Sequence, residues 1–237
     1  MRIEKAVMIF KLRSVRFAGL LLLAVGALVG CTGAFGPVRT SADGTFREQK
    51  IDFPGKDVTL SGVLFTPTAA LDYLARQADI DARNVFILGW SHGGSTVTGV
   101  VRSNALEGRA ATDPRFKAAV AFYPGCDRPL RQKVYEPTMP LLILHGAADD
   151  WSPAAPCVEL AERLKSARFP VQTIVYPDAM HGFDAPATPV RRLPNVYNPR
   201  VPGERGAHLG THEASRLKAI EETRRFLERN QTMARAL

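Results

Sequence analysis

The sequence predicts an α/β fold in which a mostly parallel sheet carries helices on both faces. Two observations indicate this: several short, wholly apolar segments of strand length, and amphipathic helical segments between them. Strands buried on both faces read as continuous apolar runs, and strands that alternate with helices along a chain pair in parallel. The composition agrees, because 46% hydrophobic and 23% charged residues are typical of a globular domain.

The first 30 residues predict a signal peptide. A basic stretch ends at Arg16 and is followed by an apolar run, of about a dozen residues, that suits a signal-peptide core better than a membrane span. The tetrad LVGC at residues 28–31 resembles the bacterial lipoprotein signal, in which the cysteine, here Cys31, is lipidated and becomes the new N-terminus. The alternative is an ordinary secretory signal, and Met8 is a second candidate start. Either signal predicts export, to the periplasmic face of a bacterial membrane or to the periplasm.

The charge distribution gives no indication of a nucleic-acid partner. The formal net charge is +8, but residues 1–30 supply five basic residues against one acid, which leaves a surplus of about four for the rest. That remainder has no block of Lys and Arg of the kind that binds a polyanion.

Residues 31–45 are small, polar and rich in Gly and Pro, which predicts a flexible tether, and residues 46–237 form one domain. FREQKIDF and DVTLSGVLF flank Pro54-Gly55 and predict a hairpin. Strands are then expected at 85–89, 118–125, 141–146 and 172–177, with helices at 70–78, from 95, at 156–167 and at 213–229. The last helix is expected to bury an apolar side made of Leu217, Ile220, Phe226 and Leu227.

The segment GWSHGGS, residues 89–95, follows an apolar strand and opens a helix. A Gly-x-Ser-x-Gly sequence in this context is typical of a nucleophile elbow, whose glycines allow a tight turn where a Cβ would strike neighbouring backbone. Ser91 is therefore the candidate nucleophile, and the backbone N–H of His92 is a candidate oxyanion donor.

A serine nucleophile needs a base, and the base needs an orienting acid. Asp149 follows the strand at 141–146, and His181 follows the strand at 172–177. Because the carboxyl ends of parallel strands share one edge of the sheet, Ser91, Asp149 and His181 are expected to meet there. Asp150 is the rival for the acid.

Two further histidines are candidate metal ligands. His208 and His212 have a spacing that can bind metal on a helix, but Gly210 lies between them and no third ligand is evident, so a loop and a helix start are expected. The chemistry requires no metal or organic cofactor. Cys126 and Cys157 are expected either to form a disulfide, which export would favour, or to remain two buried thiols.

The sequence resembles the dienelactone hydrolase family of α/β hydrolases. The matching segments are GWSHGG, FYPG, LHGAADDWSPAAPC and YPDAMHGFDAP, which lie in the family's order and cover most of residues 69–237. The resemblance implies that Asp149 is the acid, because the family's acid lies four residues before a proline, here Pro153. Many members carry cysteine as the nucleophile, whereas this chain has Ser91.

The chain departs from the family in one large respect. The family has a strand, a helix and a further strand between the hairpin and the helix before the elbow, whereas here GVLFTPT runs directly into AALDYLARQ. The missing part includes the loop that gives the second oxyanion donor. Its absence also predicts an exposed sheet edge, unless the hairpin covers it, and such an edge favours self-association. The family's carboxylate-binding arginine falls near Ala185, so Arg191 and Arg192 are left as candidates for an acidic group, or as solvated charges.

The expected function is hydrolysis of small carboxylic esters or lactones by a Ser-His-Asp triad, in a protein attached to a membrane by a lipid. The alternatives are a hydrolase-like lipoprotein that binds a ligand or partner without turnover, and a truncated copy that folds poorly.

Overall fold

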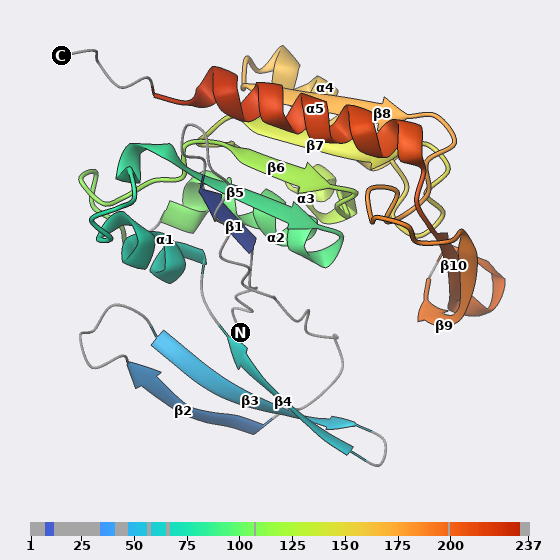
Figure 1. The fold of residues 1–237 in the computed structure, drawn as a ribbon, viewed down its shortest axis with the longest axis horizontal. Coiled ribbons are helices and arrows are strands. Elements are labelled where there is room, and N and C mark those ends of the chain that lie inside the picture. Colours follow the sequence, from blue (N-terminus) through green and yellow to red (C-terminus); the bar gives the residue numbers. More distant parts are fainter. Residues whose placement is uncertain are drawn as a thin grey trace.

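The computed structural model describes residues 8–11, 34–40, 47–55, 58–64, 67–106, 108–198 and 200–232. Five strands form the main sheet in the order β1-β5-β6-β7-β8 (Figure 1). Strands β5 to β8 are parallel, as predicted, and β1 is antiparallel to β5. The strands are β1 (Met8–Lys11), β5 (Val85–Trp90), β6 (Ala119–Phe122), β7 (Leu141–Gly146) and β8 (Val171–Tyr176).

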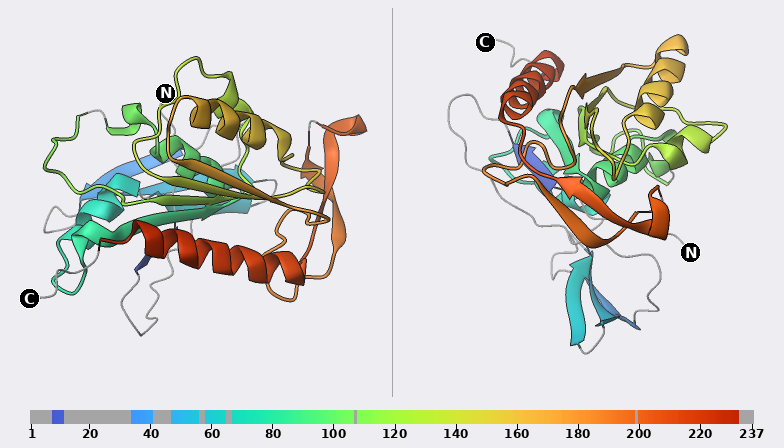
Figure 2. Two further views of the ribbon diagram at one scale, coloured as in Figure 1. Left: turned by 90° about the horizontal axis from the view of Figure 1, so that it is seen from above. Right: turned by 90° about the vertical axis from the view of Figure 1, so that its right-hand side faces the viewer.

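Helices cover both faces of this sheet, and the two-residue periodicity of the strands divides the core accordingly (Figure 2). On one face, Ile87 and Ile143 pack with α1, α2 and α4; on the other, Phe86 and Leu144 pack with α5. The helices are α1 (Pro67–Ala75), α2 (His92–Val100), α3 (Asp127–Arg131), α4 (Ala155–Ser166) and α5 (Glu213–Asn230), with short 3₁₀ turns at Ala82–Asn84, Ser103–Leu106 and Pro202–Glu204. No helix among the described residues is long and apolar enough to cross a membrane.

The predicted hairpin is present as β3 (Arg47–Gly55) and β4 (Val58–Leu64), which are antiparallel. The pairing continues through Pro54 and Gly55, so these residues lie in the strand and not in the turn. A third strand, β2 (Ala34–Thr40), pairs with β3 inside the range predicted as a tether. Together they form a separate three-stranded sheet.

The strand, helix and further strand that the family has between the hairpin and the helix before the elbow are absent between β4 and α1. β4 ends at Leu64 and α1 begins at Pro67, so the chain passes directly from the hairpin to the helix before the elbow. The hairpin does not cover the free edge of β5, contrary to one expectation. Instead β1, from within the predicted signal peptide, pairs with residues Val85 to Leu88 and occupies that edge.

Two features of the C-terminal part differ from the predictions. The segment that contains Arg191 and Arg192, and His208 for which a loop was expected, forms a second hairpin, β9 (Arg191–Tyr197) with β10 (Arg205–Leu209), beyond the carboxyl ends of the parallel strands (Figure 1). In α5, Phe226 and Leu227 are buried as predicted, but Leu217 and Ile220 are 56% and 50% exposed. The helix instead buries Ser215 and Ala219 along with Phe226 and Leu227.

Candidate active site

The nucleophile elbow has the geometry that the sequence predicts. Ser91 stands between β5 and α2 with φ 51° and ψ −115°, a strained conformation held by the surrounding structure. Two glycines explain how the turn is accommodated: a Cβ on Gly89 would lie 2.3 Å from the carbonyl oxygen of Gly93, and one on Gly94 would lie 2.7 Å from that of Phe122. A Cβ on Gly93 would meet nothing within 4 Å, so the steric requirement rests on the first glycine and on Gly94.

The three predicted residues are joined by two hydrogen bonds. His181 Nε2 lies 2.8 Å from Ser91 Oγ, and His181 Nδ1 lies 2.8 Å from Asp149 Oδ2. Each residue follows a different strand, β5, β7 or β8, at the same edge of the sheet. His181 and Asp149 are buried, and Ser91 is partly exposed, as a nucleophile open to a substrate must be.

Asp149 is fixed by the backbone around it. Its Oδ1 accepts hydrogen bonds from the N–H groups of Trp151 and Ser152, at 2.9 and 2.8 Å, while Oδ2 faces His181. Every group in contact with the two oxygens is thus a donor, or can be one. This arrangement favours a carboxylate that receives the Nδ1–H of His181 and leaves Nε2 as the acceptor of the serine proton.

Asp150, the rival acid, points elsewhere. Its carboxylate accepts the backbone N–H of His208 at 2.9 Å and lies 2.7 Å from His208 Nδ1. The next residue, Trp151, donates its indole N–H to the carbonyl of Tyr197. The two residues after the acid therefore hold the β9–β10 hairpin against the site, a role that the sequence did not suggest.

The two histidines with metal-like spacing have other partners. His208 lies on β10 and not in a loop, and is bound to Asp150. His212 is the residue before α5, as expected of a helix start, and its Nδ1 lies 2.7 Å from Ser215 Oγ. The part of the chain that the structure describes holds no cluster of His, Cys, Asp and Glu able to bind a metal ion.

Aromatic side chains pack around the base. The ring centroids of Tyr123 and Trp151 lie 4.6 and 4.9 Å from that of His181, and Trp90 stacks on Phe122 at 5.2 Å. They exclude water from the buried side of the imidazole and fix the plane of its ring. Both tryptophans thus lie near the candidate site.

A third carboxylate, not identified from the sequence, lies beside Ser91, His181 and Asp149. Asp184 accepts the Trp90 indole N–H at 2.5 Å on one oxygen and the Tyr123 hydroxyl at 2.7 Å on the other. Burial raises the pKa of Asp184, and these two hydrogen bonds act against that rise. Burial, together with the charge of Asp184, also raises the pKa of Tyr123, so the phenol remains a donor.

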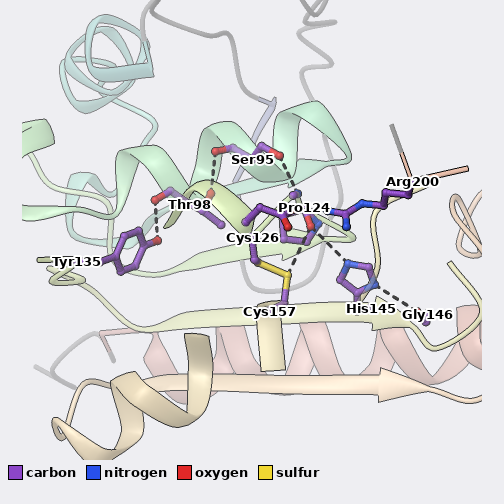
Figure 3. Close-up of a disulfide and its surroundings, with 11 residues drawn as sticks. Ser95, Thr98, Pro124, Cys126, Tyr135, His145, Gly146, Cys157 and Arg200 are labelled. Atoms are coloured by element: carbon purple, nitrogen blue, oxygen red, sulfur yellow. Dashed lines mark hydrogen bonds and ion pairs between the residues drawn. A yellow bond between two sulfur atoms is a disulfide. The ribbon is translucent and has the colours of Figure 1, made fainter. Parts of the chain in front are cut away.

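The disulfide expected as one of two alternatives is formed between Cys126 and Cys157 (Figure 3). It joins the loop after β6 to α4, behind the site. His145, at the end of β7, is completely buried nearby, with Nε2 3.4 Å from the carbonyl oxygen of Pro124. Burial lowers the pKa of His145, which favours the neutral imidazole.

The candidate oxyanion donor is the backbone N–H of His92. His92 is the first residue of α2, so its backbone N–H belongs to a helix N-terminus, which favours negative charge. Only residues 65 and 66 separate β4 from α1, which leaves no room for the loop that supplies the second donor in the family.

Solved structures similar to this chain come from several bacteria. They include a Klebsiella pneumoniae protein described as a candidate dienelactone hydrolase, with 22% identity and a TM-score of 0.46, covering 68% of this chain and 60% of that one. Esterase Est2 of Thermogutta terrifontis, bound to propionate, has 20% identity and a TM-score of 0.50, covering 72% of this chain and 65% of that one. The chain thus spans less than two thirds of the length of these two proteins.

A comparison with curated proteins found no match. The model of the dienelactone hydrolase family, however, matches residues 48–230 of the 237, from the β3 strand to the end of α5. The chain belongs to the dienelactone hydrolase family.

Proposed function

We propose that this protein is a serine hydrolase that cleaves small carboxylic esters or lactones through Ser91, His181 and Asp149. The observation that carries the proposal is the continuous hydrogen-bonded chain from Ser91 Oγ through both nitrogens of His181 to Asp149. The family is one of hydrolases, and this arrangement is what a serine nucleophile requires.

The reaction proceeds in two halves. His181 Nε2 takes the hydroxyl proton as Ser91 Oγ attacks the carbonyl carbon, and the resulting imidazolium returns that proton to the leaving alcohol. Asp149 holds the ring and stabilises its positive charge. Water, deprotonated by His181, then attacks the acyl-enzyme and releases the acid and the free serine.

Among the described residues, the His92 N–H at the start of α2 is the one candidate oxyanion donor, and a site with one donor predicts a slow enzyme. Loss of one of two donors costs about 10²–10³ in kcat where this has been measured in other serine hydrolases. We therefore expect activated esters with good leaving groups to be cleaved far better than alkyl esters.

The proposal includes export. Cys31 is the lipidation site, residues 1–30 are the signal peptide, and the domain works at the periplasmic face of a membrane; a soluble periplasmic form without the lipid is the alternative. The support is the basic, apolar and LVGC sequence of the N-terminus. Mass spectrometry of the membrane-extracted protein tests it: a lipidated N-terminal Cys31 is expected, and a chain that retains residues 1–30 would contradict it.

The proposed activity is tested by labelling the purified protein with a fluorophosphonate probe. Labelling is expected in the wild type and absent in Ser91→Ala and His181→Ala. Ser95→Ala is the matched control, because Ser95 lies one helical turn further along α2 and donates nothing to His181; it should label normally. Turnover is then measured with a panel that begins at acetyl and propionyl esters, since Est2, which has the same fold, is a propionate complex.

A second candidate function is ligand or partner binding by a hydrolase-like lipoprotein without turnover. The direct connection of β4 to α1, which removes the second oxyanion loop, favours it. A folded wild-type protein that neither labels nor hydrolyses any ester would support this candidate and reject the first.

A further inference from the structure

The inference concerns Asp184, three residues after His181, and it rests on the function proposed above. Its two carboxylate oxygens bind two side chains from distant parts of the chain. Trp90 immediately precedes Ser91 at the end of β5, and Tyr123 immediately follows β6. One carboxylate therefore connects the elbow, the end of the neighbouring strand and the loop that carries the base.

The connection reaches the end of the strand that carries the elbow. β6 pairs with β5 through Gly89 and Trp90, and the described pairing of β1 with β5 runs from Val85 to Leu88. The hydrogen bond from Trp90 to Asp184 adds an attachment one residue before the nucleophile.

The base is supported through the second oxygen. Asp184 fixes the hydroxyl of Tyr123, whose φ of 36° sets it in an unusual backbone conformation. The Tyr123 ring in turn lies against the imidazole of His181, 4.6 Å between centroids. Movement of either donor would shift Ser91 or His181, and a displacement of about 1 Å in a catalytic site can cost 10²-fold in rate.

We infer that Asp184 is a positioning residue for the reaction, which holds Ser91 and His181 in register through Trp90 and Tyr123. It acts through these two side chains and not on the reacting atoms. Two accepting oxygens are required, because the Trp90 indole N–H and the Tyr123 hydroxyl donate to different oxygens of Asp184.

The test substitution is Asp184→Asn, which keeps the shape of the side chain. An amide has one accepting oxygen, so one of the two donors then faces the NH₂ group and must move. The matched control is Asp178→Asn, which removes an exposed carboxylate three residues before His181, in a turn where φ is 57° and asparagine is tolerated.

We expect Asp184→Asn to lower kcat by about 10-fold or more with little change in KM, and Asp178→Asn to leave both unchanged. Tyr123→Phe should cost much less in the Asp184→Asn background than in the wild type, because both changes break the same connection. Equal kcat for Asp184→Asn and the wild type, or fully additive costs, would overturn the inference.

A spectroscopic readout separates positioning from a general loss of stability. The Tyr123 ring lies 4.6 Å from the imidazole of His181 between centroids, so a displaced Tyr123 ring changes the magnetic environment of the imidazole protons. The NMR signals of these protons should therefore shift in Asp184→Asn and stay unchanged in Asp178→Asn. Identical His181 signals in the wild type and Asp184→Asn would count against the inference.

These imidazole signals are assigned with His181→Ala, and their measurement needs no substrate. If the wild type neither labels nor hydrolyses esters, the proposed function fails while the NMR signals still decide the inference about Asp184.

Discussion

The two adjacent acids at the end of β7 allow a sharp test of the site. In Asp149→Asn, the amide oxygen can still accept the N–H groups of Trp151 and Ser152. The NH₂ group then faces His181 Nδ1, which must become the acceptor, and Nε2 must carry the proton. In that tautomer Nε2 cannot take the proton of Ser91. We expect kcat to fall about 10⁴-fold, the loss known for the corresponding change in a serine protease, with the fold intact.

Asp150→Asn is the matched control, since it makes the same chemical change one residue later. Its hydrogen bonds go to His208 and not to His181, so kcat should fall less than about 3-fold, within the usual effect of a change away from the reacting atoms. The assay is hydrolysis of a p-nitrophenyl ester, normalised by fluorophosphonate titration and accompanied by thermal melts. A larger loss in Asp150→Asn than in Asp149→Asn would refute the assignment of the acid.

Three further predictions concern stability and the elbow. Replacing Cys126 and Cys157 by Ala should cost about 3–4 kcal/mol by the chain-entropy relation for the 31-residue separation, and lower Tm by roughly 7–15 °C in calorimetry; an unchanged Tm would contradict it. Gly94→Ala should reduce both activity and Tm because its Cβ would clash with the end of β6, while Gly93→Ala should be tolerated; equal effects would show that the elbow adjusts freely. Burial lowers the pKa of His145, so below about pH 6.5 the unfolded chain binds the proton first and the free energy of unfolding falls as pH falls, by up to ~1.4 kcal/mol per unit; urea titrations at pH 7 and 5 should show this loss reduced in His145→Gln.

The strands of the parallel sheet could be predicted closely because burial on both faces leaves a direct signal. The expected segment 141–146 is β7 to the residue, and β5 and β8 differ by one residue at their ends. The β9–β10 hairpin was not predicted, since most of β9 is exposed and its arginines, proline and asparagine show no two-residue alternation. Its register depends instead on contacts with Asp150 and Trp151, distant in sequence.

The site could be predicted in part for a similar reason. Ser91, Asp149 and His181 each follow a recognisable strand, so topology alone brings them to one edge. Asp184 could not be identified from the sequence, because its partners lie 94 and 61 residues away along the chain. An aspartate three residues after His181 is equally typical of a turn. In α5, helical periodicity correctly predicted that Phe226 and Leu227 are buried. It wrongly predicted burial of Leu217 and Ile220, which are exposed.

If the chain is cleaved before Cys31, the main sheet of the precursor differs from that of the mature protein, because β1 lies in the segment that is removed. Before cleavage, Met8–Lys11 completes a five-stranded sheet and pairs with β5, the strand that ends in the nucleophile elbow. After cleavage that strand leaves with the signal peptide, and β5 becomes an open edge beside the elbow. Maturation would then change the sheet that carries Ser91 as well as the localisation of the protein. The precursor and the mature form should therefore differ in the rate at which Ser91 reacts with the fluorophosphonate probe.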